Sequence, residues 1–182
     1  SFGYLINKEI NSLQIITNNK TNNKILAIIG GAKMDDKLPL LESLSKKVDG
    51  IYIAGGNINS IRQNEKYSSY INSIQNNKAK IYLMEDGIGS TSLDIYPSYD
   101  SIYSNNSNIL FFDIGQKSII TLSKLITEYD IIFWNGPLGV VENELYSNGS
   151  KVLFDILKNS NKKIIIGGGD TAGFINKFDH SF

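Results

Sequence analysis

The chain has 182 residues, enough for one domain with a complete hydrophobic core. Its 18 basic and 18 acidic side chains balance, so it lacks the positive field that attracts nucleic acid or a membrane surface. It contains no cysteine, which excludes disulfides and thiolate metal sites. With no apolar run of membrane-spanning length and no signal-peptide pattern, we expect a cytoplasmic protein.

The opening segment is the first predicted element. Apolar residues between Tyr4 and Ile16 recur near helical spacing, which predicts an amphipathic helix. We therefore divide the chain into this helical segment, residues 1–16, and one α/β domain, residues 17–182.

Strands and helices then alternate along the rest of the chain. Short β-branched runs predict strands, and longer stretches with periodic leucine or isoleucine predict helices. The part from Glu85 to Ser107 has no clear period and predicts a long excursion that could form an edge hairpin. The alternation is typical of a doubly wound, mainly parallel α/β sheet with helices on both faces, as in Rossmann-like folds. The expected strands are 25–29, 51–54, 80–84, 111–115, 131–134 and 163–166, and the expected helices are 35–48, 57–63, 70–74, 118–129 and 149–159.

Four of the predicted strands run directly into glycine. In an open parallel sheet, ligands bind beyond the carboxyl ends of the strands, so four such ends would form the bottom of one binding pocket. The plain alternative is that these glycines merely permit tight strand-to-helix turns. The four junctions lead into Gly30-Gly31, Gly55-Gly56, Asn135-Gly136 and Gly167–Gly169.

The last junction also carries a carboxylate. The glycines Gly167–Gly169 let the chain turn sharply with exposed N–H groups, and Asp170 and Thr171 follow where a helix would start. A helix N-terminus attracts phosphate, whereas a carboxylate repels it. A divalent cation between the two removes this conflict, so the run predicts a metal and nucleotide site with Asp170 as the metal ligand.

Three longer motifs, in order, read GGAKMDDK at Gly30–Lys37, WNGPLGVVE at Trp134–Glu142 and GGGDTA at Gly167–Ala172. They resemble the motifs of the phosphoglycerate kinases, in the C-terminal nucleotide-binding domain of that family. The segment Gly3–Glu9 is similar to the helix that connects the two domains, which makes residues 1–16 an interdomain-type helix. The resemblance covers nearly the whole chain. It implies that the N-terminal domain and the last C-terminal segment of such an enzyme lie outside these residues.

The resemblance also implies roles for individual residues. Lys33 would approach the transferred phosphoryl group, with the backbone of Gly168 and Gly169 cradling phosphate beside it as the other catalytic positions. Lys37 would hold the nucleotide phosphates, Asp170 would hold Mg²⁺, and Glu142 would accept the ribose hydroxyls. The remaining nucleotide-binding positions would be Gly31, Ala32, Gly55, Gly56, Gly115, Asn135, Gly136, Pro137, Gly139, Val140, Gly167 and Thr171.

The implied function is binding of MgADP or MgATP, with Mg²⁺ as cofactor, in an enzyme of glycolysis. That enzyme would transfer a phosphoryl group between 1,3-bisphosphoglycerate and ADP, and its N-terminal domain would hold the bisphosphoglycerate or 3-phosphoglycerate. Because Arg62 is the only arginine here, we expect no turnover by these residues alone. We further expect a monomer that binds neither nucleic acid nor membrane.

Two other interpretations stay open. The spacing of glycines from Gly167 to Gly173 is a loosened form of the dinucleotide fingerprint, although that fingerprint belongs in an early βαβ unit. The second is a non-catalytic module that keeps the kinase fold. It is suggested by the family's usual GGGMAF, which appears here as AGGNIN at Ala54–Asn59 and predicts a more amide-rich purine pocket.

Overall fold

The structure is a computed structural model that describes residues 4–7, 14, 16–18, 22–92 and 96–179. Six parallel strands form its main sheet, in the order β1-β9-β8-β2-β3-β4. Every residue of β2, β3 and β8 is buried, which is why these strands read as nearly continuous apolar runs. The strands are β1 Tyr4–Asn7, β2 Ile25–Ile29, β3 Gly50–Ile53, β4 Lys80–Leu83, β8 Ile131–Asn135 and β9 Lys163–Gly167.

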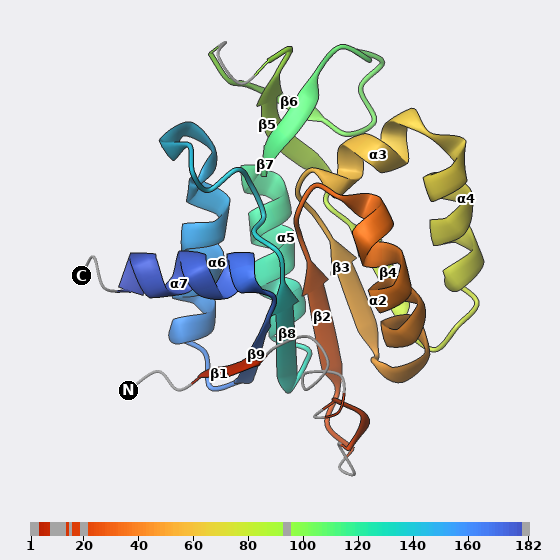
Figure 1. Cartoon of the computed structure of the whole chain (residues 1–182), viewed down its shortest axis with the longest axis vertical. Coiled ribbons are helices and arrows are strands. Elements are labelled where there is room, and N and C mark those ends of the chain that lie inside the picture. The colour runs from red at the N-terminus through yellow and green to blue at the C-terminus, as the bar shows by residue number, and fades with distance from the viewer. Residues whose placement is uncertain (1–3, 8–13, 15, 19–21, 93–95, 180–182) are drawn as a thin grey trace.

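Helices cover both faces of the main sheet, with α2 to α4 on one side and α5 to α7 on the other (Figure 1). Apolar side chains of these helices face the sheet, as Leu41 and Leu44 of α2 do. The predicted α/β fold is confirmed. Among the described residues, no helix is both long and apolar enough to cross a membrane. The helices are α2 Met34–Lys47, α3 Asn57–Gln63, α4 Glu65–Ile74, α5 Gln116–Ile126, α6 Asn148–Lys158 and α7 Gly169–Asp179, with a short 3₁₀ helix η1 at Glu144–Tyr146.

A smaller antiparallel sheet lies at the upper end of the molecule in Figure 1. It contains β5 Asp86–Ser90, β6 Ser98–Ser101 and β7 Leu110–Ile114, in the order β6-β5-β7. The pairing of β5 with β6 confirms the expected hairpin. The strand predicted near residue 111 belongs to this smaller sheet and not to the main one, because it pairs antiparallel with β5.

The opening segment departs from its prediction. Tyr4–Asn7 forms strand β1, which pairs in parallel register with β9. The helix expected over residues 4–16 is therefore wrong at its start, and residues 8–13 and 15 lie outside the described part. A few apolar residues do not distinguish a helix from a strand, and here pairing along the edge of β9 decides between them. The domain boundary at residue 16 stays a prediction.

Candidate functional site

The glycine turns stand at the carboxyl ends of four adjacent strands, β9, β8, β2 and β3. Gly31, Gly55, Gly136 and Gly168 have φ angles of 91°, 73°, 95° and 88°, in the left-handed region that other residues rarely adopt. A Cβ atom on Gly136 would lie 2.4 Å from the carbonyl oxygen of Gly30. These turns therefore need glycine for conformation and, where the turns after β2 and β8 pack together, also for space.

Backbone hydrogen bonds join the neighbouring turns. The N–H of Gly30 donates to the carbonyl of Asn135, and the N–H of Gly31 donates to that of Pro137, both at 2.8 Å. The N–H of Asn57 donates to the carbonyl of Gly31 at 2.9 Å. Main-chain bonds thus connect three turns into one continuous edge.

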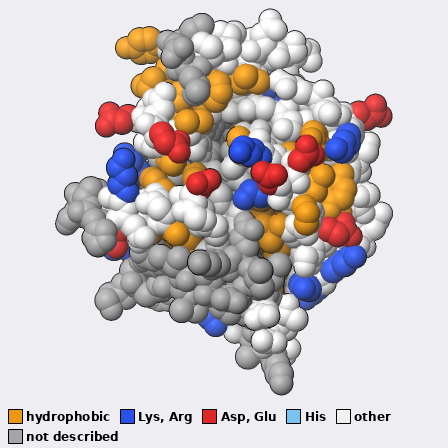
Figure 2. Space-filling view, in the orientation of Figure 1, with side chains coloured by type: hydrophobic (Ala, Val, Ile, Leu, Met, Phe, Trp, Pro, Cys, Tyr) orange, Lys and Arg blue, Asp and Glu red, His pale blue; other side chains and the backbone are white. Residues whose placement is uncertain are grey.

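A cleft of about 550 Å³ opens over this edge. Figure 2 shows lysine and acidic side chains gathered near the middle of this face of the molecule. Apart from Asp36, all of the residues that line the cleft are predicted site residues. They are Gly31, Ala32, Lys33, Asp36, Lys37, Asn135, Gly136, Pro137, Gly168, Gly169, Asp170 and Thr171.

Several polar groups converge on the cleft from different elements. Lys33 is the exposed N-cap residue of α2, and the ammonium of Lys37, one turn later, donates to Oδ1 of Asn135. The Nδ2 of Asn135 is buried without a hydrogen-bond partner. At the start of α7, Oγ1 of Thr171 accepts from the N–H of Gly136 at 2.7 Å. Two ammonium groups, an unused amide donor and a helix N-terminus together suit a phosphate group.

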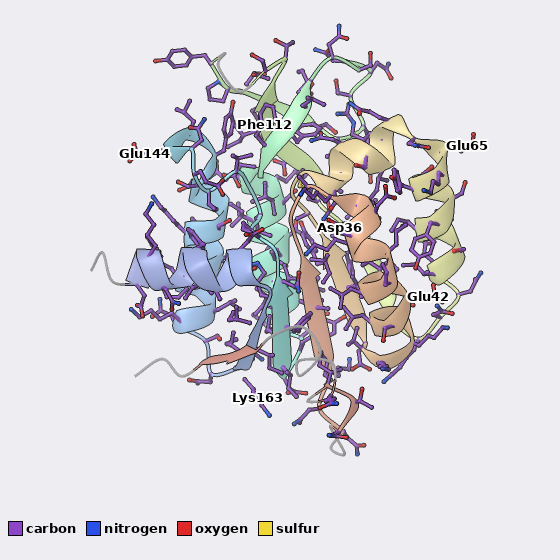
Figure 3. The ribbon with its side chains drawn as sticks, viewed as in Figure 1. Asp36, Glu42, Glu65, Phe112, Glu144 and Lys163 are labelled. Carbon is purple, nitrogen blue, oxygen red and sulfur yellow. The ribbon has the colours of Figure 1, made fainter. Side chains whose placement is uncertain are left out.

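The cleft contains two carboxylates, Asp36 in the first turn of α2 and Asp170 in the first turn of α7. Figure 3 shows Asp36 at the start of α2. No cluster of three or more histidine, cysteine, aspartate or glutamate side chains is found within the described residues. Proteins usually bind Mg²⁺ through one or two carboxylates plus substrate phosphates, so this donor set fits a magnesium nucleotide. Sequence reasoning missed Asp36, although it stands directly before Lys37 in the same motif.

Five predicted glycines do not line the cleft. Their role in the structure is close packing: a Cβ on Gly56 would lie 2.6 Å from the Cβ of Ala32, and one on Gly139 would lie 2.3 Å from the carbonyl oxygen of Tyr146. These five glycines are Gly55, Gly56, Gly115, Gly139 and Gly167.

Glu142 does not line the cleft with the two lysines. It borders a second hollow of about 290 Å³, formed by the segment after β8 together with α6 and α7. Val140 stands directly before Val141, the first residue that lines this hollow. Its N–H donates to the carbonyl of Phe112 at 2.8 Å. Glu144, labelled with Phe112 in Figure 3, borders the hollow as well.

The amides of Asn57 and Asn59 bond to backbone groups in the structure, and the amide-rich purine pocket stays a prediction. Nδ2 of Asn57 donates to the carbonyl of Gly30 at 2.9 Å. The Asn59 amide both donates to and accepts from the backbone of Phe111, each at 2.8 Å. Neither residue lines the cleft, so both amides serve to hold backbone.

A buried carboxyl group connects the small sheet to α6. Oδ2 of Asp113, in β7, accepts from the N–H of Gly149 at 3.0 Å, and Oδ1 accepts from that of Ile114 at 2.9 Å. Burial raises the pKa of Asp113 to about 7, against the opposing effect of these two hydrogen bonds. The group therefore changes charge near neutral pH.

An open parallel α/β sheet with a glycine turn, two lysines and a helix N-terminus beyond its strand ends defines a phosphate- or nucleotide-binding protein. The profile of the phosphoglycerate kinase family matches residues 1–181, and the chain belongs to that family. The phosphoglycerate kinase of Mycoplasmoides gallisepticum is 35% identical over an alignment 198 residues long. The alignment covers 97% of this chain and 48% of that protein. The chain spans about half the length of the curated relatives it matches.

Solved structures agree with this assignment. The phosphoglycerate kinase from Coxiella burnetii superimposes with a TM-score of 0.81 at 28% identity, over 95% of this chain and 49% of that chain. The enzyme from Pyrococcus horikoshii OT3 gives a TM-score of 0.69 at 21% identity, over 93% of this chain and 47% of that one, which is a likeness of fold.

Proposed function

We propose that this chain is the part of a phosphoglycerate kinase that binds MgADP or MgATP. The complete enzyme would reversibly transfer a phosphoryl group from 1,3-bisphosphoglycerate to ADP, a step of glycolysis. The observation that carries the proposal is the cleft over the glycine turns, where Lys33, Lys37 and Asp170 meet the N-terminus of α7.

The residues of the cleft would divide the work of binding and transfer. Lys37, fixed by its bond to Asn135, would hold phosphates of the bound nucleotide. Lys33 would stabilise charge on the phosphoryl group as it moves, and the backbone of Gly168 and Gly169 would cradle that group. Direct transfer in line needs only positioning and charge neutralisation, so no nucleophile is required of this chain.

Asp170 would hold Mg²⁺, and Asp36 is the other carboxylate within the same cleft. The ion neutralises phosphate charge when bound with the nucleotide. The nucleoside contacts stay predictions, namely those of Gly55, Gly56, Gly115, Gly139, Val140 and Glu142.

The acidic substrate would bind elsewhere in the enzyme, on the N-terminal domain implied by the family resemblance. Arg62, the only arginine, donates to the carbonyls of Ser104, Asn106 and Ile109 at 3.2 to 3.3 Å. Its guanidinium is therefore committed to the loop after β6. We infer that the 182 residues bind nucleotide without catalysing transfer.

Calorimetric titration tests this proposal. We expect MgADP to bind, ADP with a chelator to bind more weakly, and NADH to bind more weakly than MgADP. Tighter binding of NADH would favour the dinucleotide interpretation, and no binding of any nucleotide would favour a non-catalytic module. Formation of ATP from 1,3-bisphosphoglycerate by this chain alone would contradict the expected lack of turnover.

We also propose that the protein acts as a monomer in the cytoplasm. Sedimentation equilibrium and cell fractionation test the two statements separately. A stable dimer at micromolar concentration would contradict the first.

A further inference from the structure

The turn at Gly30 and Gly31 leads directly into Lys33, and all four of its backbone polar groups have hydrogen-bond partners. Main-chain groups satisfy three of them: the two N–H groups donate to Asn135 and Pro137, and the Gly31 carbonyl accepts from the N–H of Asn57. The fourth, the buried carbonyl of Gly30, accepts from the side chain of Asn57 at 2.9 Å. Asn57 thus holds two consecutive carbonyls of this turn.

We infer that Asn57 is a positioning residue that aims Lys33 and Lys37 at the phosphates of the bound nucleotide, an inference that rests on the proposed function. Asn57 is completely buried at the first residue of α3, and its Nδ2 also lies 3.4 Å from the carbonyl of Ala54. One amide therefore ties the turn after β2 to the end of β3.

The start of α2 depends on this turn. Lys33 is the N-cap residue of α2, and no side chain caps the helix there. The turn before Lys33 therefore helps to fix the position of the first turn of α2. It thereby also fixes the backbone positions of Lys33 and Lys37. Small displacements of groups that act on a reacting centre are costly, since about 1 Å can lower a rate about a hundredfold.

Asn59 provides a matched control on the same short helix. Replacing Asn59 removes two hydrogen bonds. Both of them connect α3 to Phe111 in the small sheet and neither reaches the Gly30-Gly31 turn. Leucine has a similar size and branching to asparagine. Because Oδ1 of Asn57 is buried without a partner, Asn57→Leu removes the donor to the Gly30 and Ala54 carbonyls and no accepted bond. The two substitutions thus compare loss of the turn contact with loss of an equivalent contact elsewhere.

The test measures binding of MgADP and of adenosine to the unaltered chain, Asn57→Leu and Asn59→Leu. We expect Asn57→Leu to weaken MgADP binding about tenfold or more, with adenosine binding changed by less than about twofold. Asn59→Leu should lower stability and leave the ratio of the two affinities unchanged. Equal losses for MgADP and adenosine in Asn57→Leu, or equal ratios in both variants, would overturn the inference.

Amide hydrogen exchange at Gly31 separates this inference from the proposed function, because it requires no ligand. We expect exchange at Gly31 to become faster in Asn57→Leu by more than the loss of global stability accounts for, and in Asn59→Leu by no more than that loss. If the unaltered chain does not bind MgADP, the proposed function fails and the exchange rates still test the turn contact. Exchange at Gly31 in Asn57→Leu that is unchanged, or faster by no more than the loss of global stability, contradicts the contact. Asn57→Ser, which removes the same donor with less steric demand, replaces Asn57→Leu if that variant does not fold.

Discussion

The glycine-turn edge of the main sheet and the small sheet hold their loops in different ways. At the edge, three main-chain hydrogen bonds join neighbouring turns, as that from Gly31 to Pro137 does, and single side chains such as Asn57 add to them. Beside the small sheet, a side chain holds the loop: the guanidinium of Arg62 donates to three loop carbonyls and stacks over Phe111, 4.8 Å from the ring centre. The first arrangement requires glycines, which form a pattern that can be recognised in the sequence. The second depends on a single arginine, which forms no such pattern.

The largest effect is expected for Gly136→Ala at the glycine-turn edge. A Cβ there would lie 2.4 Å from the Gly30 carbonyl oxygen, at a φ of 95°. Strain and overpacking together should lower the free energy of unfolding by about 2–5 kcal/mol, measured in urea. Gly173→Ala in α7 is the control, since nothing lies within 4 Å of its added Cβ, and it should stabilise by about 0.5–1 kcal/mol. A loss below about 1 kcal/mol for Gly136→Ala would show that the edge can adapt.

The two lysines of the cleft should differ in a full-length enzyme that contains this domain. Lys33→Ala should lower kcat by about 10²–10³, roughly 3–4 kcal/mol, because its charge acts mainly in the transition state. Lys37→Ala should mainly raise KM for nucleotide. Steady-state kinetics measures both. An unchanged kcat with raised KM in Lys33→Ala would remove the role assigned to it.

An intermediate effect is expected where the side chain holds the loop. Arg62→Leu should lower the free energy of unfolding by about 1–3 kcal/mol, because three carbonyls lose a charged donor. It should also speed proteolysis within residues 102–109 and leave MgADP affinity unchanged. Gln63→Leu, at an exposed neighbour on α3, should stay within about 0.5 kcal/mol. Weakened MgADP binding in Arg62→Leu would show that the two regions are coupled.

The last prediction is a slope of stability against pH, and it concerns Asp113, which connects the small sheet to α6. Burial raises its pKa from the usual 3.8 to about 7, so between these values the folded protein keeps a proton that the unfolded chain has lost. Stability from this group is present below the lower value and is lost as pH rises toward 7, by at most about 1.4 kcal/mol per pH unit. Asp113→Asn should flatten that slope in urea unfolding series, whereas exposed Asp155→Asn should not. If the free energy of unfolding depends on pH equally in Asp113→Asn and in the unaltered chain, the dependence comes from groups other than Asp113.

The sequence predicted those parts of the molecule whose signals are local. Buried parallel strands such as β2 and β8 read as apolar runs, and a left-handed φ requires glycine at their ends. Contacts between distant residues were not predictable. Arg62 reaches a carbonyl 47 positions away, and the Asn57 amide turns toward a backbone group and not toward the cleft, which depends on how α3 packs. The sequence predicts a helix where β1 lies, because the partner strand β9 that decides the structure is far away in the sequence.

The pairing of β1 with β9 has a consequence for how the protein folds during synthesis. Tyr4 is synthesised before its partner Ile164, which follows 160 positions later in the sequence (164 − 4). In the sheet, β9 lies between β1 and β8, so it must enter after both have been made. Contacts so distant in sequence form slowly. Because β9 ends in the turn that starts α7, the cleft cannot be complete before β9 has been inserted between β1 and β8.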